Sequence, residues 1–422
     1  MKIKGLRWWI IGLIAVATVI NYIDRTALAI MWPSISEDLG MTHSDYAILL
    51  NVFMIAYAIG QTVTGKLFDK VGTRIGFVLS IGIWSLSTVL HSIARGIFSF
   101  GIFRASLGVS EAGNWPGAAK SNAEWFPIKE RAIAQGIFNA GASMGSVIAP
   151  PLIALLWVAY GWEITFVVIG SLGLLWIIPW MIVNKNVPSK HPWITDKERS
   201  YIVEGQHQKE QSNANSKGLS IRQILSFKAA WSVLISRFFL EPIWWLFVGW
   251  MPIYLADVYG FDVKQIGIFA WVPYVGAAIG SILGGGFSGR MIANGASINK
   301  ARKTAILIGG IIMFTGLLAT IFYADTALKF VLIVAFVLFG FQFTIGNIQT
   351  LPSDLFYGKS VGSLAGLGGT VGVFAVIIMN FLVPVISKIS YTPIFVMIAI
   401  FVPMGILSVY LLARNIKPVQ ED

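Results

Sequence analysis

Cysteine is absent from this 422-residue sequence, and histidine occurs only four times. Without cysteine the chain has no disulfide framework, no thiol nucleophile, no iron–sulfur cluster and no cysteine-ligated zinc. The histidines, at positions 43, 91, 191 and 207, do not have the spacing of a metal site. The sequence also lacks a G-x-S-x-G elbow, a phosphate-binding glycine loop and a histidine–carboxylate pair. We therefore expect neither an enzyme nor a bound metal or cofactor.

Charged residues are also scarce. They make up 12% of the chain, against about 25% in an ordinary soluble protein, whereas 56% of the residues are hydrophobic. So few charges cannot cover a water-facing surface around a core of this size, and most of the apolar surface must therefore face lipid. The net charge of +11 would suggest nucleic acid as a partner if the protein were soluble, so the positions of the charges matter.

Long apolar runs replace the missing charges. A lipid-spanning helix needs about 20 apolar residues, because only a helix or a closed barrel satisfies its backbone hydrogen bonds in hydrocarbon. The runs are continuous rather than alternating with a period of two, and they are too long for barrel strands. We predict an all-α membrane protein with twelve transmembrane helices, at about residues 8–31, 45–67, 76–94, 97–116, 133–158, 162–184, 229–256, 265–287, 304–323, 328–349, 361–387 and 391–413.

The basic residues indicate which loops lie in the cytoplasm. With the N-terminus inside, twenty-four of the 31 lysines and arginines lie on cytoplasmic segments and four on the opposite side. Both termini are therefore predicted to be cytoplasmic, and no nucleic-acid partner is needed to explain the positive charge. The remaining three, Arg25, Arg104 and Arg237, lie inside predicted spans. Because Asp24 and Arg25 interrupt the first apolar run, we expect a mature first helix rather than a signal peptide.

A polar segment at residues 185–228 divides the chain into six-helix halves at 1–184 and 229–422. Thr195, with Glu198 three residues later, predicts a short amphipathic surface helix at 195–204. Further on, residues 211–217 are of low hydrophobicity and predicted to be disordered.

The two halves contain a weak repeat. The pattern E-x-F-x-x-K begins at Glu124, D-x-F-x-x-K begins at Asp354, and each has a glycine seven residues after its lysine. Two sets of six helices around a linker, with an internal repeat, predict a transporter of parallel halves with its site between them.

The segment from Gly65 to Arg74 reads G-K-L-F-D-K-V-G-T-R. It resembles the G-x-L-x-D-[RK]-x-G-R signature of the major facilitator superfamily, which implies the fold of that superfamily. Asp69, Lys70 and Arg74 lie by helix ends, where they can clamp neighbouring helices in one of two conformations. The equivalent segment of the second half, 284–290, has no acid, so we expect a weaker clamp there.

A second motif of the superfamily, R-x-x-x-G-x-x-E, runs from Arg104 to Glu111 in the fourth stretch. The two charged residues are seven apart and share a helical face. Burying either alone in hydrocarbon is expensive, so each is expected to be paired or to face water. We assign Arg104 to the conformational clamp.

Several other segments resemble the anion:cation symporter family, whose members move sugar acids and other organic anions with protons or sodium. In the first half these are NYIDR from Asn21, SEAGNWP from Ser110, EWFP from Glu124 and FNAG from Phe138. In the second half, RFFLEPIWW from Arg237 and VGSLAGLGG from Val361 resemble the hexuronate permeases most. The resemblance extends over essentially the whole chain.

A hexuronate is a small anion coated with hydroxyl groups, so its site needs a fixed cation, amide or hydroxyl partners, and aromatic faces. The resemblance places Arg25 at the substrate carboxylate and Tyr22, one turn earlier, at a hydroxyl. The other predicted substrate contacts are Asn139, Arg237, Trp115, Trp244, Trp245 and Asn347. The tryptophans can also be explained as interfacial belt residues, and Arg237 and Glu241, four apart, can simply satisfy each other.

Coupling requires groups that change charge. The resemblance assigns this role to the carboxylates of Asp24 and Glu111, with H+ as the coupling ion and Na+ as the alternative. Protons would neutralise both acids, the substrate would neutralise Arg25, and the compensated site would rock across the membrane. A purely structural role of both acids in ion pairs is the competing interpretation.

The favoured function is thus proton-coupled symport of a hexuronate such as galacturonate or glucuronate, by a monomer in the cell membrane. The alternatives are symport of an aldonate, an aldarate or another organic anion, and organic-phosphate/phosphate antiport. The intramembrane acids Asp24, Glu111 and Glu241 count against antiport.

Overall fold

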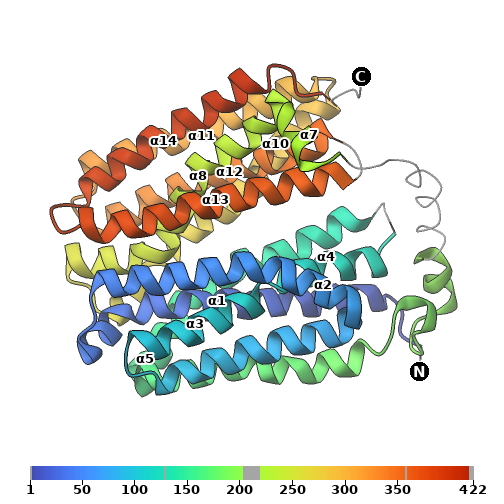
Figure 1. Cartoon of the computed structure of the whole chain (residues 1–422), viewed down its shortest axis with the longest axis horizontal. Coiled ribbons are helices and arrows are strands. Elements are labelled where there is room, and N and C mark those ends of the chain that lie inside the picture. Colours follow the sequence, from blue (N-terminus) through green and yellow to red (C-terminus); the bar gives the residue numbers. More distant parts are fainter. Residues whose placement is uncertain (1, 128–129, 203–218, 357–358, 418–422) are drawn as a thin grey trace. The chain divides into compact units, whose positions relative to one another are not determined.

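The computed structural model describes residues 2–127, 130–202, 219–356 and 359–417. It is almost entirely helical (Figure 1), and the twelve predicted stretches all fall on helices. The chain forms two compact units, one of residues 1–214 with 262–268 and one of residues 215–261 with 269–422. The predicted halves and their linker stay a prediction, as do residues 203–204 of the surface helix and the segment 211–217, which lie outside the described residues.

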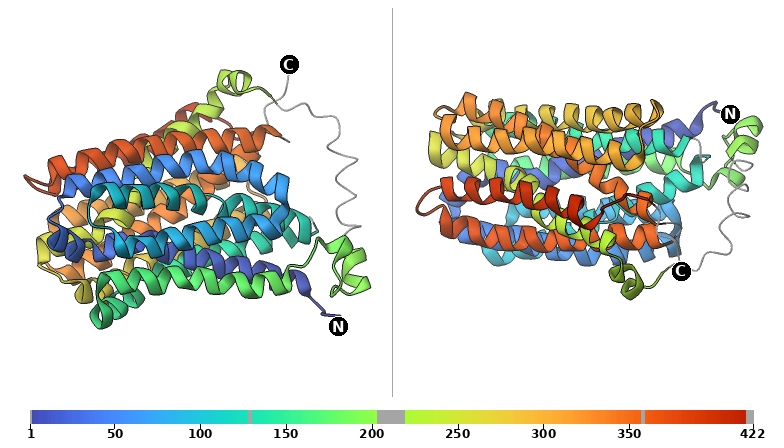
Figure 2. Two further views of the ribbon diagram at one scale, coloured as in Figure 1. Left: turned by 60° about the horizontal axis from the view of Figure 1, so that its bottom comes forward. Right: turned by 90° about the horizontal axis from the view of Figure 1, so that it is seen from above.

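The first unit is built mainly from five helices. They are α1 (Leu6–Leu39), α2 (His43–Leu90), α3 (Ile97–Glu111), α4 (Asn114–Trp125) and α5 (Arg131–Val183), with the short helix η1 (His91–Ile93) after α2. The fourth predicted stretch, 97–116, is therefore divided between α3 and α4. In the views of Figure 2, the long helices of this unit run side by side.

Two glycines turn the chain inside α2 and α5. Gly72 has φ +75° and Gly161 has φ +77°, and at each of them the helix breaks between two predicted spans. These dihedral angles are costly for any residue with a Cβ atom, so glycine allows two spans to follow each other with almost no loop. The sequence placed both breaks correctly, between 67 and 76 and between 158 and 162.

Most of the remaining helices belong to the second unit. In chain order, the remaining helices are α7 (Ile221–Ser226), α8 (Lys228–Tyr259), α9 (Val263–Phe269), α10 (Val272–Ala293), α11 (Ile298–Tyr323), α12 (Ala327–Leu355), α13 (Lys359–Ile386) and α14 (Thr392–Leu412). The predicted span 265–287 is interrupted between α9 and α10, because Pro273, in the first turn of α10, has no backbone N–H to continue the hydrogen bonding of α9. All but the last residue of α9 belongs to the first compact unit.

The helices have the length and composition of membrane spans. Among the described residues, nine helical segments are long and apolar enough to cross a bilayer, and the number of crossings stays a prediction. Large apolar side chains lie exposed on them, such as Ile282 at 74% and Leu155 at 69%. Exposure on this scale is what a lipid-facing surface requires. The protein is therefore an all-α membrane protein.

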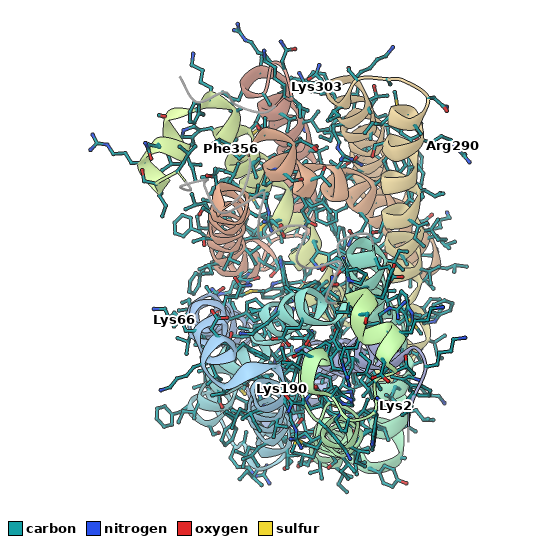
Figure 3. All side chains as sticks on the ribbon, turned by 90° about the vertical axis from the view of Figure 1, so that its right-hand side faces the viewer. Lys2, Lys66, Lys190, Arg290, Lys303 and Phe356 are labelled. Carbon is teal, nitrogen blue, oxygen red and sulfur yellow. The ribbon has the colours of Figure 1, made fainter. Side chains whose placement is uncertain are left out.

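Basic residues gather at one end of each unit. Figure 3 shows Lys2, Lys66 and Lys190 at the same end of the first unit, and Arg290 and Lys303 at one end of the second. This is the distribution that the positive-inside rule expects within each unit.

The N-terminus of α1 is capped by a residue nearly two hundred positions away. Residues 196–202 are helical, and Glu198 N–H donates to the Thr195 hydroxyl as predicted. The Glu198 carboxylate, however, accepts the backbone N–H groups of Gly5, Leu6 and Arg7 at 2.9 to 3.3 Å. It thus satisfies the free donors at the start of α1, where its negative charge is also favourable.

Candidate transport site

Four ionisable side chains lie buried together in the first unit. Asp24 and Arg25 come from α1, Arg104 and Glu111 come from α3, and each is at most 8% exposed. Ionisable groups are rare inside apolar helices because removing them from water is expensive, so they indicate function. The sequence identified all four residues but not which of them would pair.

Arg25 pairs with Glu111. Its Nε atom donates to the Oε2 oxygen of Glu111 at 3.0 Å, and its Nη2 atom lies 2.9 Å from the same oxygen. Within the described part of the chain, the Oε1 oxygen of Glu111 is buried and has no hydrogen-bond partner. One carboxylate oxygen therefore holds the guanidinium while the other stays available for a proton.

An aromatic cage surrounds the Arg25 guanidinium. Its carbon lies 5.1 Å from the ring centre of Tyr22, 5.4 Å from that of Phe53 and 4.9 Å from that of Tyr57. Nη2 also donates to the Asn21 side-chain oxygen at 3.2 Å. Sequence reasoning found Tyr22 but missed the two α2 residues, because no local motif marks a side chain that becomes a neighbour only through packing.

Asp24 lies beside this pair. Neither of its carboxylate oxygens has a hydrogen-bond partner among the described residues, although the side chain is 1% exposed. Glu111 and Arg104 are its charged neighbours. The Nε and Nη2 atoms of Arg104 are likewise buried without hydrogen-bond partners in the described segments. Arg104 therefore lies with the buried charges, and its assignment to the conformational clamp stays a prediction.

Close packing between α1 and α5 positions the cage. A Cβ atom on Gly145 would lie 2.7 Å from the Val19 carbonyl oxygen and 2.7 Å from the Tyr22 Cβ. Both distances are too short for a side chain, so glycine is needed for α5 to reach the α1 turn that carries Tyr22. A substitution here would displace the residues next to Arg25.

The other predicted contacts of the first unit are Asn139 and Trp115. Asn139 is exposed on α5, where its side-chain oxygen accepts from Gln135 at 3.4 Å. Trp115 is half-buried with its ring 5.3 Å from that of Phe138. Their roles stay predictions.

A second ion pair lies on α8 in the second unit. Arg237 donates through Nε to Oε1 of Glu241 at 2.9 Å and through Nη2 to the same oxygen. One helical turn further, Trp244 stacks on Phe341, with 5.7 Å between ring centres, and Trp245 is half-buried. Three of the predicted second-half residues, Arg237, Trp244 and Trp245, therefore lie on neighbouring turns of one helix.

Asn347 lies elsewhere in the second unit, within a polar network between helices. Its side-chain oxygen accepts from Arg302 at 3.3 Å, and its amide nitrogen donates to the carbonyl oxygens of Gly284 and Phe343 at 3.2 and 2.9 Å. With 1% exposure and these bonds, the side chain is held between helices. Its predicted role as a substrate contact stays a prediction.

The predicted clamp residues of the first unit bond to two different helices. Asp69 pairs with Lys120 of α4 at 2.9 Å, whereas Lys70 is exposed. Arg74 donates to the carbonyl oxygens of Met181 and Lys185 at the end of α5, at 3.5 and 3.2 Å. The segment thus joins α2 to both α4 and α5, and its switching role stays a prediction.

Glu124, which begins the first copy of the repeat, is bonded to the same segment of α2. Thr73 donates to Glu124 at 2.9 Å. Burial raises the pKa of Glu124 above its ordinary value, and the Thr73 hydrogen bond and the Lys120 charge oppose that rise.

The second unit has an ion pair between helices that the sequence did not predict. Segment 284–290 has no acid, but Asp354 of α12 pairs with Arg302 of α11 at 2.9 Å. Arg302 also donates to the Ser288 hydroxyl of α10 at 3.0 Å, so three helices are joined. The acid belongs to the second copy of the repeat, and the expectation of a weaker clamp at 284–290 stays a prediction.

We expect the two links to differ in their effect on stability. Asp354→Asn should lower the free energy of unfolding by about 2–3 kcal/mol, because the pair is largely buried, with side-chain exposures of 16% and 13%. Asp69→Asn should cost less than about 1 kcal/mol, since the Asp69 side chain is 81% exposed. Thermal unfolding in detergent checks both, and equal shifts of the two midpoints would contradict this interpretation.

Buried charge pairs inside apolar helices, in a protein of two multi-helix units, are typical of a membrane transporter. Residues 14–380 match the family model described as the Major Facilitator Superfamily, and the chain belongs to that family. The match covers most of the sequence and includes every predicted coupling residue. The superfamily resemblance seen in the motifs is confirmed.

Known relatives and solved structures agree with this family. The chain is 33% identical to the hexuronate transporter of Escherichia coli (strain K12) over 424 residues, covering 100% of this chain and 96% of the relative. It is 34% identical to the galacturonate transporter of Dickeya chrysanthemi over 314 residues, or 74% and 90% of the two chains. A solved bacterial homologue of the human lysosomal transporter Spinster, inward-facing and occupied, superposes with a TM-score of 0.73 at 16% identity over 98% of each chain, which shows the fold alone.

Proposed function

We propose that this protein is a proton-coupled symporter of a sugar acid, a hexuronate such as galacturonate or glucuronate, which works by alternating access in the cell membrane. The observation that carries the proposal is the buried Arg25–Glu111 pair with the unpartnered Asp24 carboxylate beside it. The two relatives named for hexuronate and galacturonate transport support the choice of substrate. The positive-inside distribution supports cytoplasmic termini.

The cage around Arg25 has the chemistry that a hexuronate requires. The guanidinium can exchange the Glu111 carboxylate for the carboxylate of the substrate, in a charge-assisted bond of the same kind. Tyr22 and Tyr57 offer both a hydroxyl group and an aromatic face for the C–H side of a sugar ring. Asn139, Trp115, Arg237, Trp244 and Trp245 complete the proposed substrate contacts.

Proton coupling follows from competition for Arg25. While Glu111 is ionised, it occupies the guanidinium. A proton taken up by Glu111 removes the competing charge, and a second proton on Asp24 keeps the neighbourhood of the bound anion from becoming too negative. Substrate and protons therefore stabilise the same state, which is the thermodynamic requirement for symport.

The test is uptake into proteoliposomes that hold the purified full-length protein. Galacturonate or glucuronate uptake should be driven by a proton gradient with the acidic side outside. It should collapse with a protonophore and persist without sodium. Uptake that withstands both the protonophore and sodium removal would contradict the coupling. Phosphate counterflow in place of galacturonate uptake would contradict the substrate and point to the antiporter.

A further inference from the structure

The second unit contains an ion pair that resembles the first one in geometry. In α8, Arg237 directs two nitrogens to one oxygen of Glu241, just as Arg25 directs two nitrogens to one oxygen of Glu111. The α8 pair is less enclosed, with side-chain exposures of 17% for Arg237 and 12% for Glu241. It is therefore less completely shielded from its surroundings than the Arg25–Glu111 pair.

A contribution to stability does not account for the Arg237–Glu241 pair. An Arg–Glu pair four residues apart on a helix contributes only about 0.2–0.5 kcal/mol in water. In apolar surroundings the desolvation cost of two charges is often larger than their attraction, and well-packed hydrophobic side chains are as stable or more stable. Arg237 and Glu241 lie in α8, a helix apolar enough to span the membrane. A role in function accounts for them better.

Glycines of α13 make room for the pair. A Cβ atom on Gly368 would lie 3.1 Å from Cδ of Arg237, and one on Gly372 would lie 2.6 Å from Cγ of Glu241. A side chain at either position would press on the ion pair. α13 therefore presents backbone to both residues, and Arg237 Nη1 donates to the Ala365 carbonyl oxygen at 3.4 Å.

This arrangement leaves Glu241 and Arg237 dependent on each other. Arg237 is the charged group bonded to Glu241 in the described residues, and from α13 two glycines and the Ala365 carbonyl group lie against the pair. The charged residues of α12 and α13, which are Lys329, Asp354 and Lys359, lie near the ends of these helices. From α14, Gly405 packs on the neighbouring Leu240 and presents no titratable group. Neutralising Glu241 would thus leave the guanidinium without a counter-charge.

Resting on the proposed function, we infer that Glu241 is a third proton-linked group, which controls Arg237 as Glu111 controls Arg25. When a carboxylate oxygen of Glu241 takes a proton from water, its bonds from Arg237 weaken. The freed guanidinium then binds an anionic oxygen of the transported sugar acid. When the substrate leaves, Glu241 releases its proton and recovers Arg237. The second unit would thus add one proton-dependent contact to the transport cycle.

The test compares wild type with Glu241→Gln in proteoliposomes between pH 5.5 and pH 8, with galacturonate as substrate. Glutamine has nearly the same shape and carries no charge, so at every pH it holds Arg237 by neutral hydrogen bonds alone. We expect the KM of the variant at pH 8 to be about 10-fold below that of wild type, the value of one charge-assisted hydrogen bond. Protons taken up per galacturonate, measured with an entrapped pH dye, should fall.

Asp325→Asn is the matched control. Asp325 pairs with Lys329 with the same four-residue spacing in the second unit, but the two side chains are 66% and 57% exposed. Its KM, pH profile and proton uptake should equal those of wild type.

A double variant covers the case in which Glu241→Gln folds poorly. Arg237→Met with Glu241→Met removes both charges and keeps similar side-chain volumes. A purely structural pair predicts an unchanged KM, whereas a freed Arg237 that binds substrate predicts a KM at least about 10-fold higher at pH 5.5.

Two results would overturn the inference in different ways. A Glu241→Gln variant with the same KM and the same proton uptake as wild type would reject the switch alone. A wild-type protein that neither binds nor moves galacturonate would reject the proposed function, and the switch with it.

Discussion

Replacing Arg25 by alanine should remove the thermal stabilisation that galacturonate gives to the wild-type protein. A ligand that binds the folded state raises the unfolding midpoint according to its affinity. A charge-assisted bond to a carboxylate contributes about 1.5–3 kcal/mol, so we expect binding to weaken roughly 10- to 100-fold. A thermal-shift titration in detergent, with galacturonate, glucuronate, an aldonate, an aldarate and inorganic phosphate, measures this and ranks the substrates at the same time.

The single variant needs a control, because Glu111 would remain buried without its partner. Breaking a buried ion pair from one side costs about 3–5 kcal/mol, so Arg25→Ala should also lower the midpoint without ligand. The double variant Arg25→Ala with Glu111→Ala removes both charges and should recover part of that loss. It should still fail to respond to galacturonate. A double variant that responds like wild type would show that Arg25 does not hold the substrate.

Replacing Asp24 by asparagine should separate transport from its driving force. Asparagine cannot exchange a proton, so accumulation of galacturonate driven by a pH gradient should fall to the level reached without a gradient. Exchange of labelled for unlabelled galacturonate needs no net proton movement and should persist. Glu111→Gln should act in the same direction, and it should also release Arg25, which favours binding at high pH.

The readouts are gradient-driven uptake and counterflow in the same proteoliposome preparation. Asp196→Asn, at a site 80% exposed in the linker segment, is the control and should leave both unchanged. Asp24→Asn that still accumulates galacturonate against its concentration gradient would remove Asp24 from the coupling mechanism. Loss of both activities together would point to a structural role.

The transport site could be predicted only in part. Its ionisable residues are visible in the sequence, because a charge inside an apolar stretch is conspicuous and expensive. Their partners are not visible, because Arg25 and Glu111 are 86 residues apart and their side chains meet only in the folded unit. Phe53 and Tyr57 likewise lie next to Arg25 only because of packing between helices.

Glu198 and Asp354 show how a local motif can have a distant use. Each belongs to a recognisable pattern, a capping box and an internal repeat. The carboxylate of Glu198 nevertheless caps α1, and that of Asp354 pairs with Arg302 of another helix. A carboxylate satisfies whichever free donors are nearest in space, and sequence distance does not limit that choice.

The sequence by itself determined the membrane class, the positions of the helices, the breaks near Gly72 and Gly161, and which charges are buried. These properties depend on the transfer of short segments from water to lipid and on backbone conformation, both of which are local. Only the tertiary structure decided that Arg25 pairs with Glu111, that Arg302 pairs with Asp354, and that glycines of α13 enclose the Arg237–Glu241 pair. Pairing and enclosure depend on which helix faces meet, and side-chain packing across the whole unit sets those faces.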